Sequence, residues 1–166
     1  MATTAVNRRA WPFLRLPDRM TSSTPAWRWD VEERTALVEA LFTAWSSGDP
    51  DAPRQYLTED AVLDDVIGGV YRGWPAIRAY FARGLASWPD LRLEPTGQWW
   101  SRDDGLAFTW VMSATVSDDR FGPGTAGRRW QAPGMSFVVF DGDRVRHEVD
   151  YHDGGSRARS LQTPDP

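Results

Sequence analysis

The chain of 166 residues contains no cysteine and no lysine. Without cysteine, thiol nucleophiles, disulfide bonds and thiolate metal sites are excluded. Without lysine, all 19 basic residues are arginines, which excludes Schiff-base chemistry on a lysine and a lysine-containing phosphate-binding loop. The chemistry left to a site is that of carboxylates, imidazole, phenol, hydroxyl groups and arginine.

Histidines and long apolar runs are also scarce. His147 and His152 are the only histidines, and in a strand they would point to opposite faces, so we expect no metal site. No apolar run reaches the roughly 20 residues that span a bilayer, and we expect no membrane association. The net charge of −4 gives no general attraction to nucleic acid. The N-terminal segment has no compact apolar region of the kind that directs secretion, so we expect a cytoplasmic protein.

The most informative segment that is present runs from residue 144 to residue 153. It has the composition of a strand, in which Glu148, Asp150 and His152 would share one face. Two carboxylates and an imidazole on one face are costly to bury, and they are also the groups that general acid–base catalysis needs. The alternative is an edge strand whose charges lie in water. The opposite face, which indicates packing, would carry Val145, His147, Val149 and Tyr151.

The chain divides into three parts by its patterning. Residues 1–29 show no sustained period and predict an N-terminal arm that is partly disordered. Residues 30–153 contain the periodic segments and predict one domain. Residues 154–166, rich in Ser, Arg, Gly and Pro, predict a flexible tail.

Helical patterns come first within the predicted domain, and strands follow. Apolar residues recur at helical spacing over about 30–45 and again over 74–87, with a short helix over about 50–57 and a strand over 61–67 between them. Four strands are then expected at about 91–101, 105–117, 128–140 and 144–152. This order predicts an α+β fold, a cone-shaped α+β barrel in which the helices cover one face of a curved, mostly antiparallel sheet. The concave face would hold an apolar pocket.

Five motifs occur in an order typical of one superfamily. The chain resembles the nuclear transport factor 2-like superfamily, most closely its SnoaL-like branch, over about residues 31–153. The motifs are Ala44-Trp-Ser-Ser-Gly-Asp49, Leu57-Thr-Glu-Asp-Ala-Val62, Tyr71-Arg-Gly-Trp-Pro-Ala-Ile-Arg-Ala-Tyr-Phe81, Asp141-Gly-Asp-Arg-Val145 and Asp150-Tyr-His-Asp153.

The resemblance can be followed into two enzyme families of this superfamily. In ketosteroid isomerases the general base is an aspartate at the place of Asp65, but the positions matching that family's oxyanion hole are Leu41 and Ser136. In limonene epoxide hydrolases an Asp–Arg–Asp set activates water; the Asp150-Tyr-His-Asp153 ending matches one aspartate. The positions matching the other aspartate and the arginine are Ser113 and Val111. Neither mechanism is therefore expected in its known form.

SnoaL-like polyketide cyclases use an aspartate as acid and base within an apolar pocket, and the resemblance implies that Asp150 or Asp65 fills this role. If Asp65 points into the pocket, burial is expected to raise its pKa. His152 would tune or relay the proton of Asp150. Each of these residues could instead be a solvated or structural side chain at a strand end.

Several further side chains are candidates for the pocket wall. Ser136 and Glu148 could contact a substrate, although Glu148 could equally form a structural salt bridge. An aromatic stripe at helical spacing is more often core than ligand site. The aromatic candidates are Trp45, Tyr80, Phe81, Trp100 and Trp110.

The leading hypothesis is a cofactor-independent enzyme that moves protons on a hydrophobic small molecule, in a cyclisation, isomerisation or elimination. Asp150 and Asp65 would be its carboxylate pair, because two carboxyls in different environments can divide acid and base roles. Two alternatives are a non-catalytic small-molecule binding or association module and an epoxide or lactone hydrolase. The resemblance also implies a homodimer formed through the outer sheet face.

Overall fold

The first long helix follows from the apolar stripe of its sequence. A computed structural model describes residues 31–162, and in it α1 (Val31–Trp45) carries Glu32 and Glu33 in its first turn, where the helix dipole favours negative charge. Val38, Leu41, Phe42, Ala44 and Trp45 are the buried residues of this helix. The helix therefore has one apolar side, and that side packs against the sheet.

The remaining elements follow in the predicted order of helices before strands. After α1 come η1 (Ala52–Tyr56), β1 (Leu57–Asp65), β2 (Gly69–Arg72), α2 (Trp74–Ser87), β3 (Arg92–Arg102), β4 (Gly105–Thr115), β5 (Arg129–Asp141), β6 (Arg144–His152) and α3 (Ser156–Gln162). The N-terminal arm predicted at 1–29 and the last four residues lie outside the part that the structure describes.

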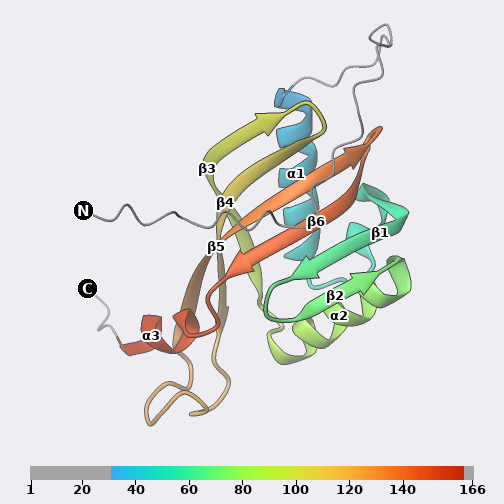
Figure 1. Ribbon diagram of the computed structural model, residues 1–166. Coiled ribbons are helices and arrows are strands. Elements are labelled where there is room, and N and C mark those ends of the chain that lie inside the picture. Colours follow the sequence, from blue (N-terminus) through green and yellow to red (C-terminus); the bar gives the residue numbers. More distant parts are fainter. Residues whose placement is uncertain (1–30, 163–166) are drawn as a thin grey trace, which may run out of the picture.

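The strands form one sheet of six in the order β2-β1-β6-β5-β4-β3. β1 runs parallel to β6, and every other neighbouring pair is antiparallel. Figure 1 shows α1 crossing behind this sheet and α2 beside β1 and β2. The α+β prediction is confirmed, with one difference: β2 and β3 stay unpaired at the two edges within residues 31–162, so the sheet is an open one and no closed barrel forms.

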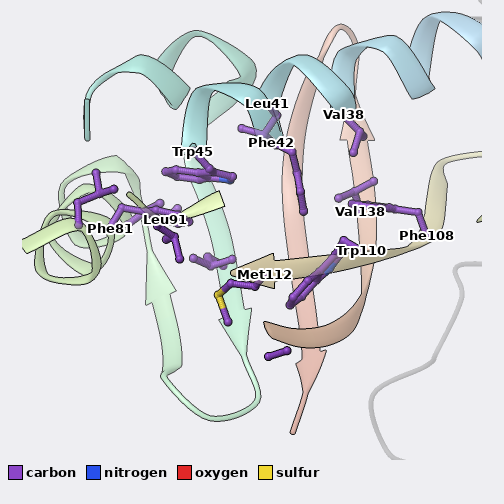
Figure 2. Close-up of a cluster of buried hydrophobic side chains, with 14 of the residues drawn as sticks. Val38, Leu41, Phe42, Trp45, Phe81, Leu91, Phe108, Trp110, Met112 and Val138 are labelled. Carbon is purple, nitrogen blue, oxygen red and sulfur yellow. The ribbon is translucent and has the colours of Figure 1, made fainter. Parts of the chain in front are cut away.

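The core lies between α1, α2 and the inner face of the sheet. Figure 2 shows its aromatic centre, in which Trp45 stacks on Phe81 with the two rings 6° from parallel, and Phe42 meets Phe108 edge to face. Trp45, Phe42 and Phe108 are each no more than 2% exposed. Full burial of such side chains contributes roughly 1.5–3 kcal/mol each. This packing fixes α1 and α2 against the sheet and leaves the strand ends of β1 and β6 beside α2.

A short strand that the sequence analysis missed precedes α2. Gly69–Arg72 forms β2, which pairs with β1 from Val62 to Asp65. Its residues are exposed or half-buried, so it lacks the apolar alternation by which strands are identified. β1 also begins at Leu57 and ends at Asp65, where the pattern predicted 61–67.

The tail predicted to be flexible contains a helix. α3 packs on β5, its Leu161 is 3% exposed, and the hydroxyl of Ser160 accepts a hydrogen bond from the backbone N–H of Gln131. Leu161 is the single large apolar residue of this helix, so no apolar period marks it in the sequence. The helix is stabilised by its packing on β5, and a tertiary contact of this kind cannot be recognised from the local sequence.

One residue of β6 lies on the face opposite to the predicted one. The register of β5 with β6 shifts between Val139 and Phe140, so that Val145 pairs with Phe140 while His147 pairs with Val139. Arg146 is the extra residue of a bulge, which reverses the alternation before it. Val145 is consequently fully buried in the core, and the placement predicted for it with His147 on the outer face is wrong.

Candidate functional site

A cavity of about 350 Å³ opens where β1 and β6 end beside α2, a volume within the range of ligand pockets. β1, β4 and β6 supply polar and aromatic residues to its wall, α2 supplies one long side, and α3 reaches it from the C-terminal segment. The lining residues central to its chemistry are Asp65, Tyr80, Phe81, Arg83, Trp110, Asp150, His152 and Arg157.

Three neighbouring strands bring the polar groups of the pocket together. Asp65 of β1 is the cross-strand partner of Asp150 of β6, and Asp150 is in turn the partner of Ser136 of β5. Side chains directly opposite one another on one sheet face lie close enough to interact. The predicted pair Asp65 and Asp150 is therefore brought to one place by the register of the sheet.

Asp65 is held by four hydrogen-bond donors. Its Oδ1 accepts from the backbone N–H groups of Ile67 and Gly68, at 2.8 and 2.7 Å. Its Oδ2 accepts from the hydroxyl of Tyr80 at 2.5 Å, and Nε2 of His152 lies 3.2 Å from Oδ1. Asp65 is 5% exposed, so this carboxylate is solvated almost entirely by the protein.

These donors decide the charge of Asp65. Burial alone would raise the pKa of its carboxyl, but the four hydrogen bonds outweigh burial and hold the pKa well below the ordinary value of 3.8. The expectation of a raised pKa at Asp65 is therefore wrong. The carboxylate stays ionised at neutral pH, which makes it an acceptor that orients its neighbours and a weak base.

Tyr80 stays protonated beside this charge. Burial, followed by the negative charge of Asp65, raises the pKa of the Tyr80 phenol far above its ordinary value. The hydroxyl therefore acts as a permanent donor to Asp65.

His152 is oriented by the same carboxylate. Because ionised Asp65 can only accept, Nε2 of His152, the nitrogen that faces Asp65, is assigned as the donor of this contact. The other nitrogen, Nδ1, is buried and has no hydrogen-bond partner among the described residues. The ring also lies against Trp110, with centroids 6.0 Å apart. His152 is thus held in one orientation, with Nδ1 left unpaired among the described residues.

Asp150 ends a chain of hydrogen bonds that starts at an indole. Nε1 of Trp110 donates to the Ser136 hydroxyl at 2.7 Å, and that hydroxyl donates to Oδ1 of Asp150 at 2.5 Å. Because the Ser136 oxygen already accepts from Trp110, the single hydroxyl hydrogen of Ser136 is free to point to Asp150. Ser136 is fully buried and positions Asp150 without lining the pocket.

The charge state of Asp150 is balanced near neutrality. Burial raises the pKa of Asp150 to about 7; the Ser136 hydrogen bond opposes the increase and the negative charge of Asp65 adds to it. Two adjacent carboxyls therefore differ, since Asp65 is fixed as an anion while Asp150 can gain and lose a proton near pH 7. A group with such a pKa suits general acid–base catalysis.

Glu148 lies deeper on the same face of β6 and outside the pocket lining. It is 3% exposed. Burial, together with the neighbouring Asp150, raises its pKa well above the ordinary value of 4.5. The position therefore favours a neutral carboxylic acid inside the core. No ion pair forms between Glu148 and Arg128 or Arg146 in the described part of the chain.

Replacing Glu148 with glutamine (E148Q) is expected to stabilise the protein at alkaline pH. A raised folded-state pKa contributes stability below the unfolded-state pKa, and this contribution is lost as pH rises through the folded-state pKa. Glutamine has no such loss, so the variant should exceed the wild type by about 1–3 kcal/mol at pH 9 and differ less at pH 6. Urea unfolding at both pH values measures this. The exposed helix variant E39Q serves as control, and an equal pH dependence in wild type and E148Q would contradict the buried neutral acid.

The predicted aromatic residues divide between pocket, core and surface. Tyr80, Phe81 and Trp110 line the pocket, while Trp45 lies behind Phe81 in the core. Trp100 is 52% exposed, so its prediction as a pocket residue is wrong. In β3, every second side chain from half-buried Leu93 points to the core, and this series includes Trp99. Trp100 therefore points away from the core.

Two arginines of the pocket were missed by the sequence analysis. Arg83 lies three residues after Tyr80, at the spacing that keeps helical residues on one face, so this signal was available. Arg157 belongs to α3, in the segment predicted to be a flexible tail. No local pattern could have assigned it to the site.

Two further observations concern metals and membranes. Within residues 31–162, the Asp, Glu and His side chains form no cluster of three or more that could hold a metal ion. The helices of the same part of the chain are all too short or too polar to cross a membrane.

Solved structures from three bacteria share this fold. IdmH from Streptomyces antibioticus, a proposed polyketide cyclase, superposes with a TM-score of 0.68 at 19% identity, over 78% of this chain and 99% of that one. A proposed polyketide cyclase from Acidithiobacillus ferrooxidans gives 0.67 at 20% identity, over 78% and 94%. A protein of ketosteroid isomerase-like fold from Catenulispora acidiphila, in complex with trimethylamine, gives 0.66 at 18% identity, over 77% and 93%.

Sequence comparison places the chain in a family. Curated protein sequences gave no significant match. The profile of the SnoaL-like domain, in contrast, matches residues 38–148, which include all of α1 after Leu37, the strands up to Glu148 of β6, and Asp65. This match extends over more than half of the chain and agrees with the sheet order and the pocket between β1, β6 and α2. The chain therefore belongs to the SnoaL-like domain family, within the nuclear transport factor 2-like superfamily.

Proposed function

We propose that this protein is an acid–base enzyme that moves a proton on a hydrophobic carbonyl compound, as in an intramolecular aldol cyclisation. The observation that carries the proposal is the carboxyl of Asp150, whose pKa is raised to about 7 in a mainly apolar pocket next to the ionised Asp65. Near neutral pH this group can both accept a proton and return it. The polyketide cyclases proposed among proteins of the same fold agree with such a reaction.

The proposed reaction uses Asp150 twice. As a carboxylate, it removes a proton from the carbon next to a carbonyl group, and the resulting enolate forms a carbon–carbon bond with a second carbonyl carbon of the same molecule. As a carboxylic acid, it then returns that proton to the oxygen of the new alkoxide. No electrons leave or enter the substrate, so the cycle requires no cofactor.

The other polar groups position Asp150 and the substrate in this proposal. Ser136 holds one oxygen of Asp150 at 2.5 Å, which leaves the second oxygen for the substrate. Asp65 orients His152, and its fixed negative charge helps to keep the pKa of Asp150 high. This division differs from the predicted Asp65–Asp150 acid–base pair, because Asp65 serves as an orienting anion.

Proton exchange on a simple ketone tests the proposal without knowledge of the substrate. 2-Tetralone is an apolar bicyclic ketone with acidic hydrogens next to its carbonyl group. In D2O at pH 7.5, the protein is expected to accelerate the replacement of these hydrogens by deuterium, measured by proton NMR. Binding of 2-tetralone without faster exchange would contradict an acid–base enzyme and favour the non-catalytic binding module.

The outer face of the sheet supports the proposed homodimer. Phe137 and Tyr151 are 44% and 52% exposed, and their rings meet edge to face with centroids 6.1 Å apart. Exposed aromatic pairs of this kind are common in interfaces. Sedimentation velocity measures the oligomeric state directly, and a monomer at micromolar concentration would contradict the proposal.

A further inference from the structure

Arg157 brings to the pocket a cation that has no carboxylate partner among residues 31–162. Its guanidinium carbon lies 4.7 Å from the ring centroid of Trp130, a contact that fixes the side chain against the core. Its Nε is buried and has no hydrogen-bond partner among the described residues. The same side chain lines the pocket. The guanidinium makes no hydrogen bond or ion pair with the other residues of 31–162, so the part of it that lines the pocket can donate to a ligand that supplies an acceptor.

Arg83 lies at the rim of the same pocket and, like Arg157, has an aromatic ring beside its guanidinium. It is exposed, and its guanidinium carbon is 5.9 Å from the ring centroid of Tyr71. No carboxylate of residues 31–162 lies within ion-pair distance of Arg83 or of Arg157. Several other arginines of this part of the chain do pair with a carboxylate: Arg78 pairs with Asp51 and Arg120 with Asp118. Arg83 and Arg157 therefore combine a place at the cavity with the lack of a carboxylate partner among residues 31–162.

The charges of the pocket are arranged in two parts. Asp65 and Asp150 lie on the sheet side, where Asp65 has its own donors in Tyr80, His152 and the loop backbone. Arg157 approaches from α3, outside that network of hydrogen bonds. Because the negative charge of Asp65 is already satisfied locally, the Arg157 cation remains available to a ligand.

We propose that Arg157, with Arg83 at the rim, binds an anionic oxygen of the ligand, so that the ligand is an apolar ring compound bearing a carboxylate or an ionised enol. The proposal deepens the proposed function, on which it rests for the use of this pocket. It also gives α3 a role, since this short helix carries a specificity-determining residue into the site. Guanidinium groups recognise such oxygens by paired, charge-assisted hydrogen bonds.

Matched pairs of probes separate charge from shape. 2-Naphthoate is compared with neutral 2-naphthamide, and ionised 4-hydroxycoumarin with neutral coumarin, at pH 7.5 by tryptophan fluorescence and by NMR titration. In the wild type, at least one anion is expected to bind about tenfold more tightly than its neutral partner, which corresponds to about 1.4 kcal/mol. The first pair reports on a carboxylate and the second on an enol oxygen.

The arginine variants assign this preference. R157Q is expected to weaken binding of the preferred anion about tenfold and to change binding of the neutral probe less than twofold, whereas R157K should keep part of the preference. R159Q is the matched control on the same helix. Arg159 is exposed and pairs with Asp153, so this variant shows the effect of weakening the attachment of α3 without changing Arg157. Thermal unfolding checks that each variant is folded.

Each outcome decides between the proposals. Equal affinities for anion and neutral probe in the wild type, or an unchanged preference in R157Q, would overturn the role of Arg157. Loss of the preference in R159Q as well as in R157Q would overturn it too, because helix docking would then explain both. Failure of all four probes to bind would contradict this proposal and the proposed function together. An anion preference without ketone exchange would leave the ligand class standing and contradict the enzyme alone.

Discussion

Replacing Asp150 with asparagine (D150N) is expected to slow the deuterium exchange of 2-tetralone by about 10²- to 10⁴-fold, the usual contribution of a positioned general base. Asparagine keeps the shape of the side chain and can still accept the Ser136 hydrogen bond, but it cannot take up the proton. The variant should therefore fold and bind the ketone with nearly unchanged affinity. Exchange rates from proton NMR and affinity from fluorescence measure the two effects separately.

The direction in which the wild-type exchange rate changes with pH is a second test of Asp150 as the base. The burial that raises the pKa of Asp150 to about 7 leaves the carboxyl protonated in acid, where it cannot act as a base. The exchange rate should accordingly fall as pH decreases through about 7 and level off above it. D64N is the control. Asp64 precedes Asp65 at the end of β1, but its side chain points to the opposite face of the sheet. A D150N variant with wild-type exchange would show that another group moves the proton.

Replacing Asp65 with alanine (D65A) is expected to destabilise the fold by about 3–5 kcal/mol, the range for removal of one partner from a buried charged network. The variant leaves the Tyr80 hydroxyl, Nε2 of His152 and two backbone N–H groups without their acceptor. Urea unfolding at pH 7 measures the loss. The matched change D64A removes a carboxylate from the neighbouring position and should cost less than 1 kcal/mol.

Acid unfolding adds a second readout for Asp65. A lowered folded-state pKa contributes stability above the unfolded-state pKa, near 3.8, and this contribution is lost as pH falls through the folded-state pKa. The wild type should therefore lose stability in acid more steeply than D65A. If the two proteins showed the same slope below pH 4, the network around Asp65 would not hold an ionised carboxylate.

The elements that carry the site could be predicted from the sequence because their patterns are long and local. The segment 144–152 was predicted as a strand with its observed bounds, and 74–87 as a helix with its observed bounds. Glu148, Asp150 and His152 do share the inner side of β6, although only Asp150 and His152 reach the cavity. Strand alternation alone leads to this placement once one face of the sheet is covered by helices.

The charge states of the two aspartates could not be predicted in the same way. They depend on which donors reach each carboxyl. Those of Asp65 come from the turn after β1, from Tyr80 on α2 and from His152 on β6, whereas Ser136 on β5 donates to Asp150. The turn approaches α2 so closely that a Cβ added at Gly68 would lie 2.9 Å from the Tyr80 ring. A tertiary contact of this kind leaves no periodic signal, and burial alone suggested the opposite direction for Asp65.

Arg157 and Val145 show two other reasons why sequence patterns fall short. Arg157 reaches the pocket through α3, a helix stabilised by docking on β5 and by the burial of Leu161. Val145 faces the core because Arg146 is a bulge residue, and a single inserted residue reverses the alternation predicted for the residues on one side of it. The first feature depends on how a helix docks on the sheet, and the second on how neighbouring strands pair.

Titration of the Asp150 carboxyl tests the central claim most directly. In protein labelled with ¹³C-aspartate, the side-chain carboxyl carbon of Asp150 is assigned by its absence from D150N and followed by NMR between pH 4 and pH 9. The proposed function predicts a midpoint near 7, because burial and the ionised Asp65 disfavour the charge on Asp150. A midpoint near the ordinary value of 3.8 would contradict it, since Asp150 would then be too weak a base to remove a proton from carbon.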